Sequence, residues 1–297
     1  MANEIVESLL RIKSGRSNWG FEFDRWRSYL HLLPKQDWSD IQKYFIISTG
    51  RTGTQFLARF FNEFKSVYSV HEPKPDFVKL GVDYAYGRVN RSKAIKKIER
   101  GRRAICKDVK RNAKKIYLES NNRVFSLIGV LDEVFNEYKI IHIVRDGRDY
   151  VRSGMSRDWW YTEKDWNPRM KASEFKDDPY RDKWEDMSKF EKICWRWQKK
   201  DNIIYESLKD RDDFIRLKFE DIFKDEDYAG IYEMGEYIGL RREEIKKNIQ
   251  KMMDRKINAT KEYEIKKWPE WTEEMIDTFE EIAGDHMKKY YDYSWER

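Results

Sequence analysis

The chain has 297 residues, enough for one large domain or two small ones. Charged residues make up 38% of it and the mean hydropathy is -0.93, but an aromatic content of 15% excludes a disordered chain, because disordered chains are poor in aromatic residues. The net charge of +6 is spread among many acids, so it fits an anionic small ligand as well as nucleic acid.

Cysteine and histidine usage points to a reducing compartment and away from a zinc site. Cys106 and Cys194 lie in separate apolar segments, and none of the four histidines is at i,i+4 spacing from another. The N-terminus lacks a signal-peptide layout, and no run approaches the ~20 apolar residues of a membrane span. We therefore expect a cytoplasmic protein with no membrane span and no metal.

Residues 1–43 are predicted to form a helical extension. The segment "EIVESLLRI" has apolar residues at i, i+3 and i+4 spacing, "FEFDRWRSYLHLL" follows after a glycine, and Pro34 closes the stretch.

Apolar runs typical of strands then alternate with helical patterns. The runs that predict strands are 44–48, 103–109, 139–144 and 214–219. Such alternation favours a parallel sheet with crossover helices, and these sheets bind ligands at the carboxyl ends of their strands. We expect an α/β fold in which a central parallel sheet is flanked by helices, in the three-layer α/β/α arrangement of P-loop proteins.

Residues 154–200 interrupt this alternation. They are rich in Trp, Asp and Lys and show no clean periodicity before Phe190, which indicates a helical or irregular lid inserted over the sheet. An amphipathic helix is expected from Trp271 to the aromatic C-terminus. No repeat or low-complexity linker divides the chain, so residues 1–297 are predicted to form a single domain.

A loop of small residues, 48–54, follows the first predicted strand in "YFIISTGRTGTQFL". Gly50 and Gly53 allow successive backbone N–H groups to point at one anion, and Arg51 supplies a permanent charge. The helix that begins near Thr54 adds the positive end of its dipole. The pattern is typical of a phosphate-binding loop that lacks the lysine of ATP and GTP sites. A plain strand-to-helix turn is the alternative.

A charged turn follows the strand predicted at 139–144. Arg145 and Ser153 would lie ~12 Å apart if the interval were wholly helical, and nearer if the chain turns first. A guanidinium fork and a hydroxyl could then hold one phosphate. A capped helix start with surface ion pairs would give the same pattern.

Together, these two motifs and "RLKFEDIFKD" at 216–225 resemble the sulfotransferase family that uses 3′-phosphoadenosine 5′-phosphosulfate (PAPS). The resemblance extends from Tyr44 to the C-terminal helix. It implies that the first loop holds the 5′-phosphosulfate and that Arg145 and Ser153 hold the 3′-phosphate. It also accounts for the missing lysine, because a sulfuryl group moves in place of a γ-phosphoryl group.

The resemblance carries over to particular residues of the donor site. Those that match positions binding the donor are Arg51, Thr52, Gly53, Thr54, Gln55, Arg145, Ser153, Lys267 and Trp268. Arg51 stands where phenol-type members have lysine and carbohydrate-type members often have arginine. Lys107 stands where many relatives place a lysine on a strand facing the donor, so Lys107 and Arg51 are expected to assist catalysis. The glycine usual before the Lys267–Trp268 pair is absent here.

The segment "SVHEPKPDF" supplies the expected catalytic base. Transfer to an alcohol needs a group that accepts the hydroxyl proton. Relatives use a Glu or His shortly after the first helix, so Glu72 is the expected base and His71 the second candidate. The two prolines favour an extended, rigid presentation. Alternatively, Glu72 is a solvated loop acid or a partner of Arg51.

Two further groups are candidates for binding the acceptor. Glu119 and Asn121, in "ESNNR", resemble an acid-Ser-Asn stretch near the acceptor of related enzymes, although a helix N-cap at Ser120 or Asn121 is the favoured interpretation. The tryptophans of the lid, Trp159, Trp160 and Trp166, are suited equally to stacking on a sugar face and to packing. Trp195 and Trp197 are expected in the core.

The function predicted from the resemblance is transfer of a sulfuryl group from PAPS to an acceptor hydroxyl, with adenosine 3′,5′-bisphosphate as product. A carbohydrate or glycoconjugate acceptor is favoured over a tyrosyl or small-alcohol one. The alternatives are a P-loop kinase or NTPase, which would need a lysine after Gly53 and an acidic magnesium ligand, and a non-catalytic module binding nucleotides or nucleic acid. We expect no nucleic-acid partner, and the oligomeric state is left open.

Overall fold

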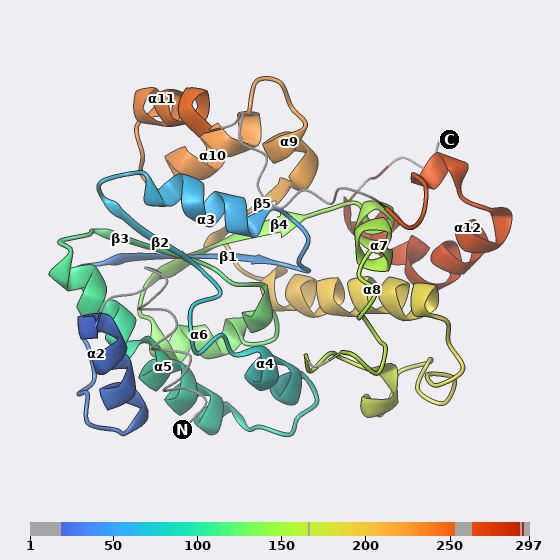
Figure 1. The fold of residues 1–297 in the computed structure, drawn as a ribbon, viewed down its shortest axis with the longest axis horizontal. Coiled ribbons are helices and arrows are strands. Elements are labelled where there is room, and N and C mark those ends of the chain that lie inside the picture. Colours follow the sequence, from blue (N-terminus) through green and yellow to red (C-terminus); the bar gives the residue numbers. More distant parts are fainter. Residues whose placement is uncertain (1–18, 166, 253–262, 292, 294–297) are drawn as a thin grey trace.

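Five parallel strands form the centre of the fold (Figure 1). The structure is a computed structural model, and it describes residues 19–165, 167–252, 263–291 and 293. The strands are β1 (Gln42–Ser48), β2 (Val67–His71), β3 (Ile116–Ser120), β4 (Tyr138–Val144) and β5 (Phe214–Lys218). Their spatial order is β2-β3-β1-β4-β5, so β1 lies in the middle. Strands β2 and β3 lie on one side of β1, and β4 and β5 lie on the other. This arrangement confirms the predicted α/β class.

The middle of strand β1, residues 44–47, is an unbroken apolar run because both faces of the sheet are covered. Phe45 and Ile47 belong to one buried core, whereas Tyr44 and Ile46 belong to the other. Side chains alternate between the two faces of a strand, so a strand buried on both faces reads as an unbroken apolar run.

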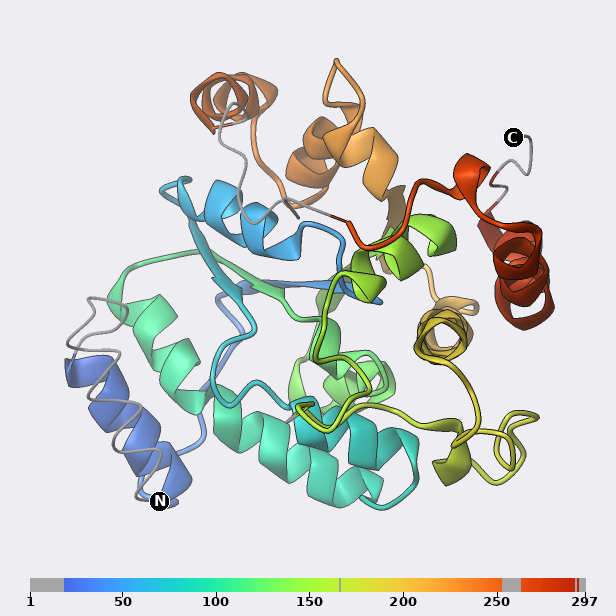
Figure 2. The same ribbon diagram turned by 45° about the vertical axis from the view of Figure 1, so that its right-hand side comes forward.

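The helices lie in one layer on each face of the sheet (Figures 1 and 2). Those that bury side chains with Tyr44 and Ile46 are α3 (Thr54–Asn62), α9 (Phe219–Phe223), α10 (Ala229–Tyr237) and α11 (Arg242–Met252). Those that share the core of Phe45 and Ile47 are α4 (Val78–Ala85), α5 (Arg91–Arg111), α6 (Ile128–Val134), α7 (Gly147–Met155), α8 (Lys189–Leu208), α12 (Glu273–Phe279) and α13 (Asp285–Tyr291). The three-layer arrangement is therefore confirmed.

The remaining elements are short or peripheral. Helix α2 (Trp19–Tyr29) packs against α5. Three 3-10 turns are η1 (Asn122–Val124), η2 (Ala172–Glu174) and η3 (Trp268–Glu270), and a π-helical turn (Glu280–Gly284) joins α12 to α13. Of the predicted N-terminal helices, the segment "EIVESLLRI" lies outside the described residues. No helix in the described ranges combines the length and apolarity needed to cross a bilayer.

The predicted strand at 103–109 is wrong, because those residues continue the 21-residue helix α5. The buried face of that helix carries Ala94, Ile98, Arg102, Ile105 and Val109, which is helical spacing with a charge in the middle. Arg102 interrupts the apolar positions of this buried face, so the short apolar run that follows it in the sequence resembles a strand. The two strands missing from the prediction are β2 and β3, both five residues long.

The irregular segment between α7 and α8 is shorter than the insertion predicted at 154–200. Ser188 begins α8 with a capping box, in which its hydroxyl accepts from the backbone N–H of Glu191 and the Glu191 carboxylate accepts from the N–H of Ser188. Residues from 189 onward therefore belong to a regular helix. Trp195 and Trp197 lie on it and are 1% and 0% exposed, as predicted for core residues.

Candidate active site

The loop after β1 has the backbone geometry of an anion site. Gly50 and Gly53 have positive φ of 101° and 68°. Gly53 is the N-cap of α3, and no side chain caps the first N–H groups of that helix. These donors are consequently open to an anion at the positive end of the helix dipole. The Thr52 hydroxyl is buried and donates to Ser48 Oγ at 2.7 Å, so it pins the loop.

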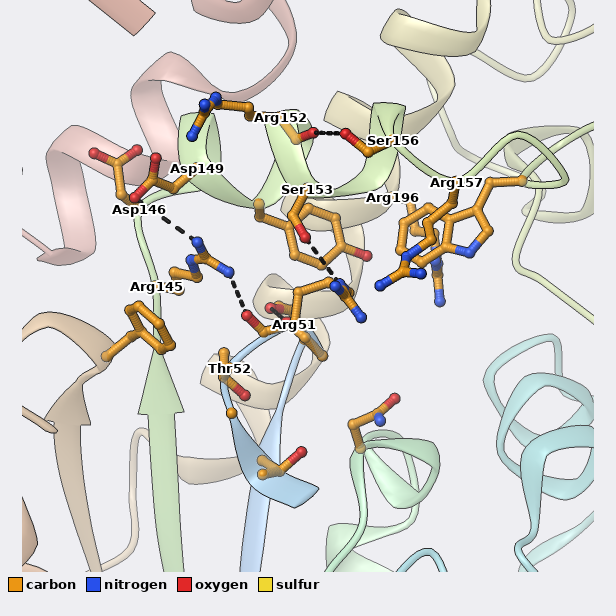
Figure 3. A pocket seen from close by; sticks show the side chains of 18 of the residues that line it. Arg51, Thr52, Arg145, Asp146, Asp149, Arg152, Ser153, Ser156, Arg157 and Arg196 are labelled. Carbon is orange, nitrogen blue, oxygen red and sulfur yellow. Dashed lines mark hydrogen bonds and ion pairs between the residues drawn. The ribbon is translucent and has the colours of Figure 1, made fainter. Parts of the chain in front are cut away.

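Arg51 also lies in the left-handed region, with φ of 60°, which is uncommon for a residue with a side chain. Its Nε donates to Ser153 Oγ at 2.9 Å (Figure 3). Burial, with the neighbouring charges of Arg157 and Arg145, lowers the pKa of Arg51 to about 10. An anion between these groups would relieve that repulsion.

Arg145, at the end of β4, contacts the same loop. It donates to the backbone carbonyl of Arg51 (Figure 3). Its guanidinium lies 4.3 Å from the centre of the Phe219 ring. Its Nε is buried with no hydrogen-bond partner among the described residues. The start of α7 next to it is capped by Asp146, which accepts from the N–H of Arg148 at 2.8 Å. The two motifs predicted from the sequence therefore meet.

Glu72 follows β2 and has a positive φ of 42°. Its carboxylate accepts from Asn122 Nδ2 and pairs with Arg123 Nη2 at 2.8 Å. The Nδ1 atom of His71 lies 3.1 Å from Ser120 Oγ, and burial lowers the pKa of this imidazole. Both His71 and Glu72 line the cleft beside the loop, as the sequence predicts.

Lys200 links the loop to Glu72 through Asn122. Its Nζ donates to the carbonyl of Thr49 at 2.9 Å and to Asn122 Oδ1 at 3.0 Å. A lysine only donates, so it turns the Asn122 amide to present its own donor to Glu72. Burial, together with nearby Arg196, holds the pKa of Lys200 well below its usual value.

The C-terminal segment reaches the cleft at Lys267 and Trp268. Lys267 is exposed, while the Trp268 ring lies 4.2 Å from the Arg148 guanidinium. One turn further along α7, Arg152 lies 3.6 Å from the centre of the Tyr263 ring and donates to the carbonyl of Ile265 at 3.2 Å. Two arginines of α7 thus hold this segment beside the helix that carries Ser153.

Both predicted tryptophans of the irregular segment also line the cleft. Trp160 is 6% exposed and packs into the core, whereas Trp159 is half-buried. Arg169 lies over both rings, at 4.7 Å and 4.6 Å, and Arg196 lies over Trp160 at 4.7 Å. We call the part of the cleft formed by Arg157, Trp159, Trp160, Arg169 and Arg196 the tryptophan end. The part formed by residues 49–55, Arg145 and Ser153 is called the loop end. Trp166 lies outside the described residues.

Three predicted site residues are not in the cleft. Lys107 lies on α5, where its ammonium pairs with Asp24 at 2.7 Å. Glu119 is 1% exposed and accepts from Arg102 at 2.7 and 2.6 Å. Asn121 caps η1 and donates to Glu119, so the N-cap interpretation is confirmed. The first lies on a helix in place of the expected strand, and the other two are occupied inside the core.

The remaining predicted residues share one cleft, which has a volume of about 1610 Å³. They are Arg51, Thr52, Gly53, Thr54, Gln55, His71, Glu72, Arg145, Ser153, Trp159, Trp160, Lys267 and Trp268. Pockets for one small ligand have volumes of about 300–1,000 Å³, so this cleft has room for two. No group of three or more His, Cys, Asp or Glu side chains in the described part of the chain is placed to hold a metal ion.

The sequence did not predict the residues that contact Glu72 or its partner Asn122. Asn122 and Arg123 directly follow the Asn that was considered for the acceptor. Lys200 falls on the buried face of α8 together with Trp197 and Ile204. A polar residue at an apolar position of a helix is the signal that would have singled it out.

This fold and cleft define an α/β protein with an anion-binding loop, a facing arginine and a carboxylate in one cavity. The sulfotransferase domain family matches residues 42–294, and the chain belongs to that family. Among solved structures, it is similar to sulfotransferase STF9 from Mycobacterium avium, with a TM-score of 0.55, 10% identity and coverage of 95% of this chain and 88% of that one.

Sulfotransferase STF1 from Mycobacterium tuberculosis H37Rv is similar too, with a TM-score of 0.54, 12% identity and coverage of 89% of this chain and 83% of that one. At these identities the likeness concerns the fold alone. No curated protein sequence matches the chain significantly.

Proposed function

We propose that this sulfotransferase takes its sulfuryl group from PAPS and transfers it to a hydroxyl of a carbohydrate or glycoconjugate. The observation that carries the proposal is the meeting of Arg51, Ser153 and Arg145 at the ends of β1 and β4, with Glu72 entering the same cleft after β2.

The groups at the loop end suit a donor with two anionic parts. The uncapped N–H groups of α3 and the Arg51 guanidinium would hold the 5′-phosphosulfate. Arg145, whose Nε is buried without a partner in the described ranges, would hold the 3′-phosphate together with Ser153. Lys267 and Trp268 line the same cleft, and we assign them to contacts with the nucleotide.

Bound there, PAPS supplies the sulfuryl group: a bond forms from sulfur to the acceptor oxygen as the sulfur–oxygen bond to the 5′-phosphate breaks, releasing adenosine 3′,5′-bisphosphate. Glu72 accepts the proton of the acceptor hydroxyl, and His71 is the second candidate for this role. Arg51 and the loop N–H groups stabilise the charge left on the phosphate oxygens.

The carbohydrate acceptor is supported by the arginine in the loop, by the Glu72–Pro73 pair and by the tryptophan rings that line the cleft. A tyrosyl or small-alcohol acceptor is the alternative. The two buried, free thiols, Cys106 and Cys194, suit a reducing compartment such as the cytoplasm.

Calorimetric titration with adenosine 3′,5′-bisphosphate, run beside ATP with magnesium, tests the donor. We expect the wild type to bind the bisphosphate with micromolar affinity and Arg145→Ala to lose most of that binding. Binding of ATP-magnesium without the bisphosphate would refute the proposed donor.

A further inference from the structure

The cleft carries more positive charge than the proposed donor needs. Ten arginines and lysines line it, against three acids, Glu72, Asp146 and Asp149. Each of the three acids is paired with an arginine of the same cleft. PAPS would bring about four negative charges, since a phosphate monoester carries about two and the phosphosulfate the rest. Arg169 is also paired with Asp165, which lies outside the cleft lining, so a surplus of about two positive charges remains.

The surplus is concentrated at the tryptophan end. Arg157 follows α7 directly, and its side chain makes no hydrogen bond or ion pair with any described residue. A partly buried arginine that lines a cavity and has no protein partner there is available to an anionic group of a ligand. Its charge already acts on Arg51, whose pKa it helps to lower.

Two more arginines lie beside it. The Arg196 Nη1 atom is buried and has no hydrogen-bond partner in the described part of the chain. Arg169 pairs with Asp165, which also acts on Arg196. Both guanidinium groups lie over the Trp160 ring, and this fixes their positions.

These arginines are not placed to serve the 3′-phosphate. Figure 3 shows Arg145 on one side of Arg51, and Arg157 with Arg196 on the other. The donor would extend from Arg51 toward Arg145 and Ser153. The opposite side, next to Trp159, is left for the acceptor.

We propose that the acceptor is an anionic sugar, with a carboxylate or a sulfate ester near the hydroxyl that is modified, and that Arg157 and Arg196 bind this anionic group. The inference rests on the proposed function, because it assumes that the donor occupies the loop end. Guanidinium forks match the two oxygens of a carboxylate or sulfate, and Trp159 lines the same part of the cleft, where the sugar would contact it.

The test compares sugars that differ at one carbon, which carries an anionic group in one member of each pair and a primary hydroxyl in the other; the position of the transferred label shows whether that extra hydroxyl is modified. Chondroitin oligosaccharides, which contain glucuronate, are offered with labelled PAPS beside the same oligosaccharides after carboxyl reduction; 6-O-sulfated cellobiose and cellobiose form a second pair. Transfer is measured for the wild type, Arg157→Ala, Arg157→Lys and Arg241→Ala. The last removes one positive charge from an exposed arginine outside the cleft.

We expect the wild type to favour the charged member of at least one pair by about tenfold or more. Which pair responds distinguishes a carboxylate from a sulfate. Arg157→Ala should lose about ten- to one-hundred-fold in kcat/KM for that sugar and less than threefold for its neutral counterpart. Arg157→Lys should recover part of the loss, and Arg241→Ala should match the wild type.

Affinity for adenosine 3′,5′-bisphosphate, measured on the same samples, separates two kinds of failure. A wild type that does not bind the bisphosphate refutes the proposed function. A wild type that binds it but favours the neutral sugars, or transfers to no charged one, overturns the anionic acceptor alone. Equal losses for charged and neutral sugars in Arg157→Ala would do the same.

Discussion

The loop end and the tryptophan end of the cleft both use arginine, but they hold it in different ways. At the loop end, Arg51 donates to Ser153 and Arg145 donates to the backbone carbonyl of Arg51, so both arginines are held by hydrogen bonds before any ligand arrives. At the tryptophan end, Arg169 and Arg196 lie on an aromatic ring and Arg157 has no partner among the described residues. A site for an invariant donor can be rigid, whereas a site for an acceptor defines what the enzyme selects.

The two ends also differ in where their parts lie in the chain. The loop end is made at the termini of two adjacent parallel strands, and each part sits within a short motif. The tryptophan end combines an irregular segment with the side of α8. Changes at the loop end should therefore affect donor binding with every acceptor, and changes at the tryptophan end should affect some acceptors only.

The largest effect is expected at the junction of the two ends. Glu72→Gln removes the proton acceptor but keeps a side chain that can contact Asn122 and Arg123, so kcat should fall about 10³-fold. Affinity for adenosine 3′,5′-bisphosphate should change by less than threefold. Single-turnover transfer and calorimetry measure the two quantities. A variant that loses donor binding as strongly as turnover would make Glu72 a donor residue.

Arg145→Ala should weaken bisphosphate binding by about ten- to one-hundred-fold, because it removes charged hydrogen bonds at the loop end. The loss should be the same whichever acceptor is present. Arg241→Ala, which removes one charge outside the cleft, serves as the control. If the Arg145 variant changed acceptor preference while keeping its affinity for the bisphosphate, the division into two ends would be wrong.

Gly53→Ala tests the rigidity of the loop end. The φ of 68° disfavours any side chain, and a methyl group there would collide with the Phe223 ring. The free energy of unfolding should fall by about 1–3 kcal/mol, measured by urea denaturation. Phe223→Ala in the same chain removes the collision and should cause less additional loss than it does alone. Strictly additive losses would show that the collision is relieved elsewhere.

The smallest effect is expected for Trp159→Ala, which removes a half-buried ring at the tryptophan end. The KM of a sugar acceptor should rise about three- to tenfold, because one stacking contact is lost. The bisphosphate should bind as to the wild type. Steady-state kinetics at saturating PAPS give the first value, and a weaker bisphosphate affinity would place Trp159 in the donor site.

How much of the fold was predictable depended on how the apolar pattern was interrupted. Strands β1, β4 and β5 were predicted to within two residues, because unbroken apolar runs mark strands buried on both faces. The error at 103–109 has one physical cause. Arg102 lies on the buried face of α5, and it stays there because Glu119 of β3 accepts two of its hydrogen bonds.

The same ion pair explains why Glu119, which the resemblance suggested for the acceptor site, lies in the core instead. Burial alone would raise the pKa of this carboxyl, but Arg102 and hydrogen bonds from Tyr117 and Asn121 lower it instead. A buried pair between distant elements cannot be read from a local pattern. Such a pair makes one partner resemble a break in a helix and the other resemble a functional acid.

The candidate site was likewise predictable where its residues lie in a local motif, and not where they come from distant parts of the chain. Residues of the loop end were found from two motifs, since each motif is local and its chemistry follows from its composition. Lys200 was missed because its partners, Thr49 and Asn122, are 151 and 78 positions away in the chain. The arginines of the tryptophan end gave no motif at all, and only the fold brings Arg157 near Arg196.

Helix α8 carries Arg196 and Lys200 one turn apart, and their like charges oppose each other. Arg196 lines the cleft at the tryptophan end, whereas Lys200 donates to the Thr49 carbonyl of the loop and to Asn122 beside Glu72. One helix therefore contacts both ends of the cleft. If a ligand at either end shifts this helix, we expect the affinity for the other ligand to change, and by linkage that change is mutual.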